Sequence, residues 1–340
     1  NVFVGYQSGD ATTTADSNVG VGRGTLTTNI LSDHNTAIGN GALFAHNQAS
    51  SIDSYNTAVG SNAGAAVTTG LYNTIIGGLA GDALADADSN VVVGANALTS
   101  DTLGSKTTAI GKDALAVQNF TSATDTYNTA VGFSAGVAVT TGVQNTLIGG
   151  LAGDAITTAS YNTALGYSSL SSNTTGAQNV AIGRSSLESN TTASNNTAVG
   201  FAALEVNTTG TAGTALGKSA LAANTTGTDN TGLGALALTS TTTGSNNVAV
   251  GRSALQINTT GAFNTALGKG ALVFNTTASN NTGVGYLALN ANTTGADNTG
   301  LGKGALGSNT TAANNTAVGF GSLVSNTTGA YNTAIGKSAL

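Results

Sequence analysis

The chain of 340 residues contains 48 glycines and no proline, cysteine, methionine or tryptophan, and only 7% of its residues are charged. It therefore has no disulfide or thiolate chemistry, and without proline or a three-residue glycine period it is not collagen-like. Its net charge of −6 comes from residues 1–159, which hold eleven acidic and three basic side chains, so the basic footprint of a nucleic-acid-binding protein is absent. No apolar run is long enough to predict membrane insertion.

A 17-residue repeat runs through the whole sequence. The glycine that closes each NTAVG-like motif recurs every 17 residues from Gly5 to Gly336, except for two 21-residue steps, from Gly39 to Gly60 and from Gly111 to Gly132. We number each unit so that this glycine is position 5, which gives twenty units. One such unit cannot bury its apolar side alone, so identical units stack into a continuous core. The sequence predicts an all-β fold, a single-stack parallel β-solenoid of twenty 17-residue coils.

The predicted solenoid has two parts, which differ in how regular the repeat spacing is. Residues 1–165 contain both four-residue insertions and a 72-residue, four-coil super-repeat, whereas residues 166–340 keep the regular 17-residue spacing. We expect the second part to continue the first. Because the sequence begins and ends inside a repeat unit, we also expect it to be a segment of a longer protein.

Each unit should contain one short strand, at residues 2–4, 19–21 and the equivalent positions onward. Position 2 is Thr or Val and position 4 is Val, Ile or Leu in all twenty units, while position 3 is never polar. Alternate residues of a strand share a face, so positions 2 and 4 point together. We expect this β-branched row to face the interior. Position 3 would then form an apolar outer stripe, which is typical of a partner surface, and the simplest partner is another copy of the chain.

Two further rows should hold the coils in place. The NTTG segment predicts a corner, because Asn and Gly tolerate left-handed backbone geometry. Stacked asparagines would form a ladder that keeps the coils in register. The glycines expected to shape the coils in the regular half are Gly166, Gly183, Gly200, Gly217, Gly234, Gly251, Gly268 and Gly285. The expected ladder is formed by Asn173, Asn190, Asn207 and Asn224.

The interior should be small and closely packed. Position 9 is Leu in most units, but four units that have Gly there instead carry an apolar residue at position 12. This exchange predicts that core volume moves from one side of the coil to the other. The glycines are Gly64, Gly81, Gly136 and Gly153, and the apolar residues are Val67, Leu84, Val139 and Ile156.

Position 6 is the most informative exposed row, because it mixes basic and aromatic side chains. Such a row could bind a glycan or an anionic surface, or form cation-π contacts with an adjacent chain. A solvated edge whose charges discourage lateral aggregation is an equally good interpretation. The predicted surface-contact row in the regular half is Arg184, Phe201, Lys218, Arg252, Lys269, Tyr286, Lys303 and Phe320.

No arrangement in the sequence favours catalysis, a metal or another cofactor. His34 and His46 are expected to be solvated loop side chains. Asp82, Asp86 and Asp88 offer carboxylate oxygens of the kind that calcium prefers, but a solvated corner is the favoured interpretation. The Asn-Thr-Thr triplets match glycosylation acceptors, and we favour the ladder for them instead. We therefore expect a protein that is not an enzyme.

The stretch NTALGKGALVFNTTASNNTGVGYLAL at residues 264–289 resembles the head repeats of YadA-like trimeric autotransporter adhesins. It is similar as well to the NTAIG and NTTG arrays of bacterial surface proteins and phage tail fibres that end in an intramolecular chaperone domain. The resemblance covers the whole chain, although the 17-residue unit is longer than that of the adhesins. It implies a left-handed parallel β-roll, three chains packed side by side, and service as a stiff adhesive stalk or head.

These observations together predict a structural shaft or head segment of an extracellular filament, at the cell surface or on a virion. The favoured role is a homotrimeric adhesin with a glycan or other cell-surface ligand, and the alternative is the shaft of a phage tail fibre. An ice-binding or glycan-binding solenoid is a further alternative. Ice binding is disfavoured by the expectation that position 2 is internal and by the adjacent threonines of NTT, which point in opposite directions.

Overall fold

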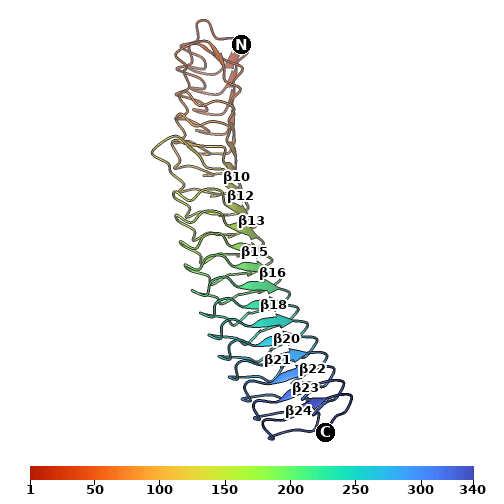
Figure 1. Cartoon of the computed structure of the whole chain (residues 1–340). Helices are drawn as coiled ribbons and strands as arrows, with labels where there is room; N and C mark the ends of the chain where they lie inside the picture. Colours follow the sequence, from red (N-terminus) through yellow and green to blue (C-terminus); the bar gives the residue numbers. More distant parts are fainter. The chain divides into compact units, whose positions relative to one another are not determined.

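The computed structural model describes all 340 residues and is all-β. Its fold is a parallel β-solenoid of twenty coils of about 17 residues, as the repeat predicts. The chain forms two compact units, Asn1–Ser168 and Ser169–Leu340, where the sequence suggests a change between residues 165 and 166. In each unit the coils stack one on the next with their strands along one side (Figure 1). The structure has no helix, and so none that could span a membrane.

The first unit contains ten three-residue strands and two short strand pairs. Neighbouring three-residue strands pair in parallel, and Thr57 for example lies opposite Thr74. The three-residue strands are β1 (Val2–Val4), β2 (Val19–Val21), β4 (Thr36–Ile38), β6 (Thr57–Val59), β7 (Thr74–Ile76), β8 (Val91–Val93), β10 (Thr108–Ile110), β12 (Thr129–Val131), β13 (Thr146–Ile148) and β14 (Thr163–Leu165).

The second unit contains ten strands of the same length, one in each coil. They also pair in parallel and without a register slip, so that Thr197 lies opposite Thr214 and Val199 opposite Leu216. The strands are β15 (Val180–Ile182), β16 (Thr197–Val199), β17 (Thr214–Leu216), β18 (Thr231–Leu233), β19 (Val248–Val250), β20 (Thr265–Leu267), β21 (Thr282–Val284), β22 (Thr299–Leu301), β23 (Thr316–Val318) and β24 (Thr333–Ile335).

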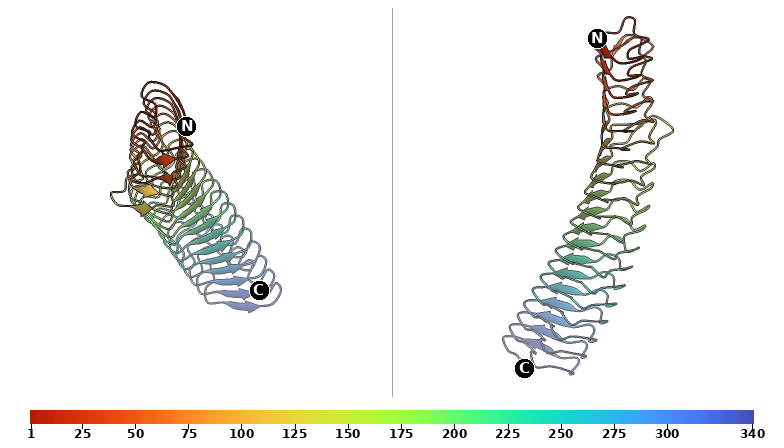
Figure 2. Two further views of the ribbon diagram at one scale, coloured as in Figure 1. Left: turned by 90° about the horizontal axis from the view of Figure 1, so that it is seen from above. Right: turned by 180° about the vertical axis from the view of Figure 1, so that it is seen from behind.

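Each four-residue insertion is accompanied by a pair of short parallel strands in the first unit. β3 (Ser32–Asp33) pairs with β5 (Ile52–Asp53), and β9 (Gly104–Ser105) pairs with β11 (Thr124–Asp125). The added residues lie just before β5 and β11, so each insertion forms a loop beside the strand pair. The loop that leads into β11 projects from the stack (yellow in Figure 2). Because the insertions lie outside the main strands, the sheet keeps its register across both of them.

The strand faces are the reverse of those predicted. Position 3 points inward: Ala198 in β16 and Ala215 in β17 are fully buried. Positions 2 and 4 point outward, so Thr197 and Val199 are half-buried and Leu216 is 50% exposed. The physical reason is size, because position 3 carries mostly Ala or Gly and faces a narrow interior that the position 9 leucines already fill. A Cβ atom placed on Gly283 would lie 3.2 Å from Leu272 Cγ.

Leucine at position 9 provides most of the core volume. Leu187, Leu204 and Leu221 are fully buried, and each has a φ between 50° and 53°. A left-handed backbone costs an L-residue roughly 1–2 kcal/mol. Burial of a leucine side chain contributes about 1.5–3 kcal/mol, which offsets that cost. The left-handed residue turns the chain so that the leucine points into the coil.

The predicted exchange of core volume between positions 9 and 12 is confirmed. Val67, Leu84, Val139 and Ile156 are fully buried. A Cβ atom on Gly81 would lie 2.8 Å from Leu84 Cδ1, and one on Gly153 would lie 2.7 Å from Ile156 Cδ1. The apolar side chain at position 12 therefore occupies the space that a position 9 leucine takes in the other coils.

The NTTG corner uses a different backbone geometry from the one predicted. Left-handed residues recur at positions 5, 7, 9 and 17, whereas the NTTG glycines such as Gly176 are not left-handed. Gly176 must be small for a different reason, since a Cβ there would lie 2.2 Å from the carbonyl oxygen of Ala193 in the next coil and 2.5 Å from Asn173 Oδ1. The asparagine side chain, held close to this glycine, forms the corner.

Candidate interaction surfaces

The outward face of the sheet is an uncharged row that runs through every coil of each unit. Position 2 is Thr or Val and position 4 is Val, Ile or Leu throughout. Leu216, Leu267 and Leu301 are 46–50% exposed, and Ile38 and Ile76 are each 39% exposed. An apolar outer stripe therefore exists, as predicted, but position 4 forms it and position 3 does not. The sequence pattern correctly placed positions 2 and 4 on one face and position 3 on the other, but it predicted the wrong face to be internal.

The predicted coil glycines lie at the end of each strand, next to this face. All eight have φ between 125° and 142°, a region that side-chain-bearing residues rarely adopt. In the second unit, a Cβ atom on Gly183 or Gly200 would lie 2.6 Å from the carbonyl oxygen of the next coil's glycine. Stacking at this distance requires glycine in every coil.

The predicted asparagine ladder is joined by side-chain hydrogen bonds. Nδ2 of Asn190 donates to Oδ1 of Asn173 at 2.9 Å, Asn207 donates in the same way to Asn190 at 2.9 Å, and Asn224 to Asn207 at 2.8 Å. These asparagines are at most 1% exposed, so a glycan could not be attached to them in the folded chain. The ladder satisfies buried polar groups and fixes the spacing of the coils, except at its end, where the next coil carries Thr241 at this position and Oδ1 of Asn224 has no partner.

A second asparagine ladder, at position 1, was missed by the sequence reasoning. The backbone N–H of Asn247 donates to Oδ1 of Asn230 at 3.0 Å, and its side-chain Nδ2 donates to the carbonyl oxygen of Gly261 at 2.8 Å. Asn258 of the other ladder donates to the same carbonyl at 2.9 Å. The sequence already indicates this ladder, because position 1 is Asn in every 17-residue repeat except those that begin at Thr107 and Gly213.

The position 6 row forms cation-π contacts between neighbouring coils of the same chain. Arg184 and Lys218 lie 5.8 and 6.0 Å from the ring centre of Phe201. Lys303 lies 5.9 Å from the ring of Tyr286 and 5.5 Å from that of Phe320. Arg252 and Lys269 belong to the same row but make none of these contacts. The three rings remain 45–51% exposed, so the row is accessible from solvent.

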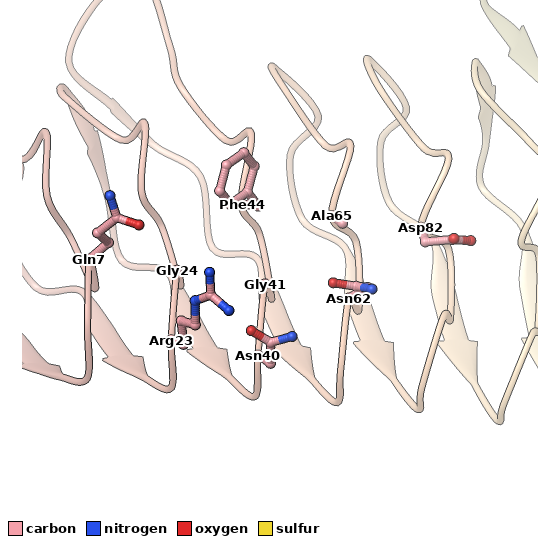
Figure 3. Close-up of a pocket in the computed structure, with 9 residues that line it drawn as sticks. All are labelled: Gln7, Arg23, Gly24, Asn40, Gly41, Phe44, Asn62, Ala65 and Asp82. Carbon is pink, nitrogen blue, oxygen red and sulfur yellow. The ribbon is translucent and has the colours of Figure 1, made fainter.

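A hollow of about 470 Å³ lies in the first unit, between the position 6 and 7 residues and the position 10 residues of successive coils. Gly24 and Gly41 at position 7 leave it open, and Phe44 stands over it (Figure 3). The polar residues that line it are Gln7, Arg23, Asn40, Asn62 and Asp82. The repeat pattern does not reveal this groove, because it depends on how two glycines and the side chains around them face one another on successive coils.

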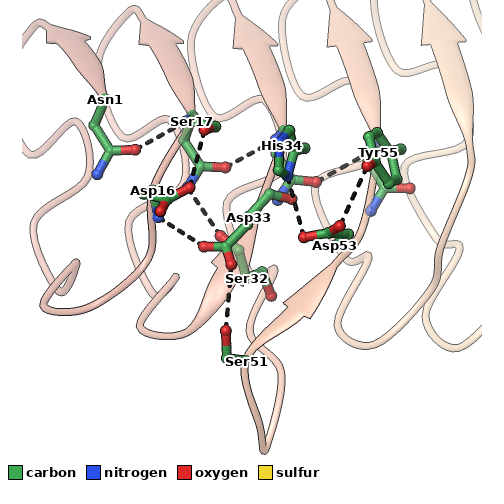
Figure 4. A network of polar contacts seen from close by, with 12 residues as sticks. Asn1, Asp16, Ser17, Ser32, Asp33, His34, Ser51, Asp53 and Tyr55 are labelled. Atoms are coloured by element: carbon green, nitrogen blue, oxygen red, sulfur yellow. Dashed lines mark hydrogen bonds and ion pairs between the residues drawn. The ribbon is translucent and has the colours of Figure 1, made fainter.

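His34 takes part in an exposed network beside the first insertion. Its Nδ1 lies 3.2 Å from Oδ1 of Asp53, and its ring stacks on Tyr55 with the ring centres 4.9 Å apart (Figure 4). The Tyr55 hydroxyl donates to the same carboxylate at 3.2 Å, and the negative charge of Asp53 raises the pKa of Tyr55. His34 is thus a solvent-exposed side chain, as predicted.

His46 is not a solvated loop residue, so that prediction is wrong. It occupies position 12, where the side chain points inward, and it is fully buried. Burial lowers its pKa to about 4. Asp101 at the same coil position is also fully buried, and burial raises the pKa of its carboxyl group. Asp101 accepts hydrogen bonds from Gln118 Nε2 at 2.7 Å and from the Gly104 N–H at 3.1 Å, in place of the usual asparagine.

The acidic stretch at residues 81–90 does not bring its carboxylates together. Asp82 accepts a hydrogen bond from Thr99 Oγ1 at 2.5 Å, and Asp88 accepts one from the Leu71 N–H at 2.7 Å. Asp86 accepts a hydrogen bond from Thr69. No group of three or more His, Cys, Asp or Glu side chains is placed to hold a metal ion.

Neither the models of known protein families nor the sequences of curated proteins give a match to this chain. A function for the protein must therefore be argued from its geometry and from the properties of its exposed rows.

Proposed function

We propose that this chain is a non-catalytic structural segment of an extracellular filament, the shaft or head of a cell-surface adhesin. Copies pack side by side through the outward faces of their sheets, and the assembly is a trimer of left-handed coils. The resemblance of the repeats to adhesin heads supports this role and this symmetry.

One observation carries the proposal: the exposed, uncharged row at positions 2 and 4. Soluble monomers seldom expose apolar patches larger than a few hundred Å². Here a Val, Ile or Leu stands at position 4 in all twenty coils; in the second unit Leu216, Leu267 and Leu301 are about half exposed, and the others are at least partly exposed. Burying such a row against another copy removes apolar surface from water, which favours association.

Light scattering of the whole chain tests the association. The proposal predicts a mass three times the chain mass of 32.8 kDa. Substitution of Leu216, Leu267 and Leu301 by lysine places charges on the outward face and should reduce the mass to that of one chain. The matched control has lysine in place of Thr209, Thr260 and Thr294, which lie on exposed corners at the same coil spacing, and it should keep the trimer mass. A parent chain that is monomeric would overturn the association.

The shaft of a phage tail fibre is the alternative role with the same physical basis. It requires the same stacked coils and the same packing between copies, so the mass measurement does not distinguish it from an adhesin. The domains encoded next to the segment do: a virion-attachment domain would favour the tail fibre, and a membrane-anchor domain the adhesin.

Ice binding is a second candidate function, because position 2 proves to be outward. Fifteen of the twenty coils have Thr there, and the rest have Val. A flat, uncharged row of threonine hydroxyls and methyl groups at regular spacing could order water. A thermal-hysteresis assay on the parent chain decides: depression of the freezing point without a change in melting point would favour this function, and its absence would remove it.

A further inference from the structure

The groove of the first unit results from a local change in the repeat. Position 7 follows the same line on successive coils as Gln7, Gly24, Gly41 and Asn62. In other coils this position carries a side chain as large as Leu79. The two glycines therefore remove the side chains that would otherwise fill the surface here, and about 470 Å³ is left open.

The polar groups that line the groove are free to bind a ligand. The side chains of Gln7, Arg23, Asn40 and Asn62 make no hydrogen bond or ion pair with the rest of the chain. A planar guanidinium group can bind a carboxylate through two parallel hydrogen bonds. Carboxamides offer a donor and an acceptor on one group, which matches the hydroxyls of a sugar.

The ends and the wall of the groove differ in chemistry. Arg23 lies toward the N-terminal end and Asp82 at the C-terminal end, on a coil further along the stack of Figure 3. The Phe44 ring stands between them and is 47% exposed. An aromatic ring gives a flat apolar surface against which the C–H face of a sugar ring can lie. The volume is within the range typical of small-ligand sites.

We propose that this groove binds an acidic oligosaccharide. The carboxylate of a hexuronate pairs with the Arg23 guanidinium, the hydroxyls bond to the amides of Asn40 and Asn62, and one sugar ring stacks on Phe44. A peptide is a poorer occupant, because the groove offers no unpaired strand edge for its backbone and only one large apolar side chain. This site rests on the attachment role proposed above, but it does not depend on association of the chain.

Isothermal titration calorimetry on the full chain tests the proposal. The probes are trigalacturonate, trimannuronate and a hyaluronan tetrasaccharide, each with its carboxyl-methylated form as the uncharged counterpart. We expect at least one of the acidic forms to bind, and its methylated counterpart to bind at least about tenfold more weakly. No binding by any acidic probe, or equal binding by the methylated form, would overturn the proposal.

Two pairs of variants locate the site. Gly24→Leu fills the groove with a side chain that the same backbone accepts at Leu79 and Leu151, whose φ values of 55° and 58° are close to the 66° of Gly24. Its control is Gly304→Leu, at the same coil position but outside the groove. Arg23→Gln removes the cation, and Arg252→Gln is its control.

We expect Gly24→Leu to abolish binding, Arg23→Gln to weaken it at least about tenfold, and both controls to bind as the parent does. Binding that is unchanged in Gly24→Leu would show that the ligand lies elsewhere and would overturn the groove assignment. The light-scattering mass separates this failure from that of the proposed function, because neither groove variant alters the outward sheet face.

Discussion

Position 12 is a mostly buried site that different coils fill with side chains of different chemistry. Ten coils have an asparagine there that bonds to its neighbours, four have an apolar residue, and two have a buried titratable group, His46 or Asp101. Asp101 receives hydrogen bonds from Gln118 and from backbone N–H groups, whereas neither ring nitrogen of His46 has a well-formed hydrogen bond, and the nearby backbone of Thr68 only partly offsets the effect of burial. The histidine is therefore the position at which the core should be most sensitive to acid.

Acidification should loosen the coil that holds His46. Its pKa is about 4 in the folded chain, whereas the ordinary value of an unburied histidine is 6.5, so the unfolded state binds the proton more readily between these values. Stability is thus present above about pH 6.5 and falls as the pH falls toward 4. We expect a loss of about 2 kcal/mol between about pH 7 and about pH 5. Urea unfolding at both pH values measures it.

His46→Asn provides the control for that measurement, because asparagine is the usual residue at this coil position. The variant should lose most of the pH dependence while Asp101 and the exposed acids stay unchanged. If the parent and the variant respond equally to acid, the histidine is not the group responsible.

The strand faces can be tested with two neighbouring residues. Ala181 is fully buried at position 3, and Ile182 is half-buried at position 4. Ala181→Asp should cost several kcal/mol, on the order of 3 or more, because it buries a charge without a partner. Ile182→Asp should leave the coil folded and alter only association. Hydrogen exchange of the amides in β15 and β16 measures both, and protection lost in Ile182→Asp but kept in Ala181→Asp would reverse the assignment.

The sequence predicts the structure of a single coil well, but it does not predict correctly which face of the strand points into the interior. The strand positions, the glycine spacing and the asparagine ladder all follow from the 17-residue period. Alternation shows only which residues share a face; which face is internal depends on volume, and the small residues at position 3 were the available signal. Position 12 also predicts where His46 lies, once it is aligned with the Asn and Val residues of the neighbouring coils.

The groove could not be predicted from the period. It arises because Gly24 and Gly41 are neighbours in the stack and the large residues Phe44 and Asn62 come from different coils. Such a site depends on departures from the repeat, and their effect requires knowledge of how the coils face one another.

Glycine at position 5 should be irreplaceable within a coil. Gly217 has a φ of 135°, and a Cβ there would lie 2.7 Å from the carbonyl carbon of Gly234. Gly217→Ala should therefore cost more than about 2 kcal/mol. Gly304→Ala is the matched control, since its φ is 67° and a Cβ there meets no atom within 4 Å. The control should cost about 1 kcal/mol. Equal urea midpoints for the two variants would contradict the close stacking.

At the scale of the whole molecule, repetition supplies both stability and a surface. Each coil contributes one outward-pointing Val, Ile or Leu, exposed in some coils and half-buried in others, so a residue of modest effect becomes a row within each unit. The charged and aromatic residues of position 6 lie just beyond the glycine that ends the strand, and they border that row. The arrangement suits chains that pack by their sheets while their basic and aromatic edges remain in solvent.

Cysteine cross-linking tests the packing of the sheet faces most directly, because the parent chain contains no cysteine. A single cysteine is introduced either at Leu216, on the outward face, or at Thr209, on an exposed corner, and each protein is treated with a short bismaleimide. We predict that Leu216→Cys is converted to covalently linked chains at dilute concentration and that Thr209→Cys is not. Efficient linkage of Thr209→Cys with none in Leu216→Cys would contradict the proposed association face.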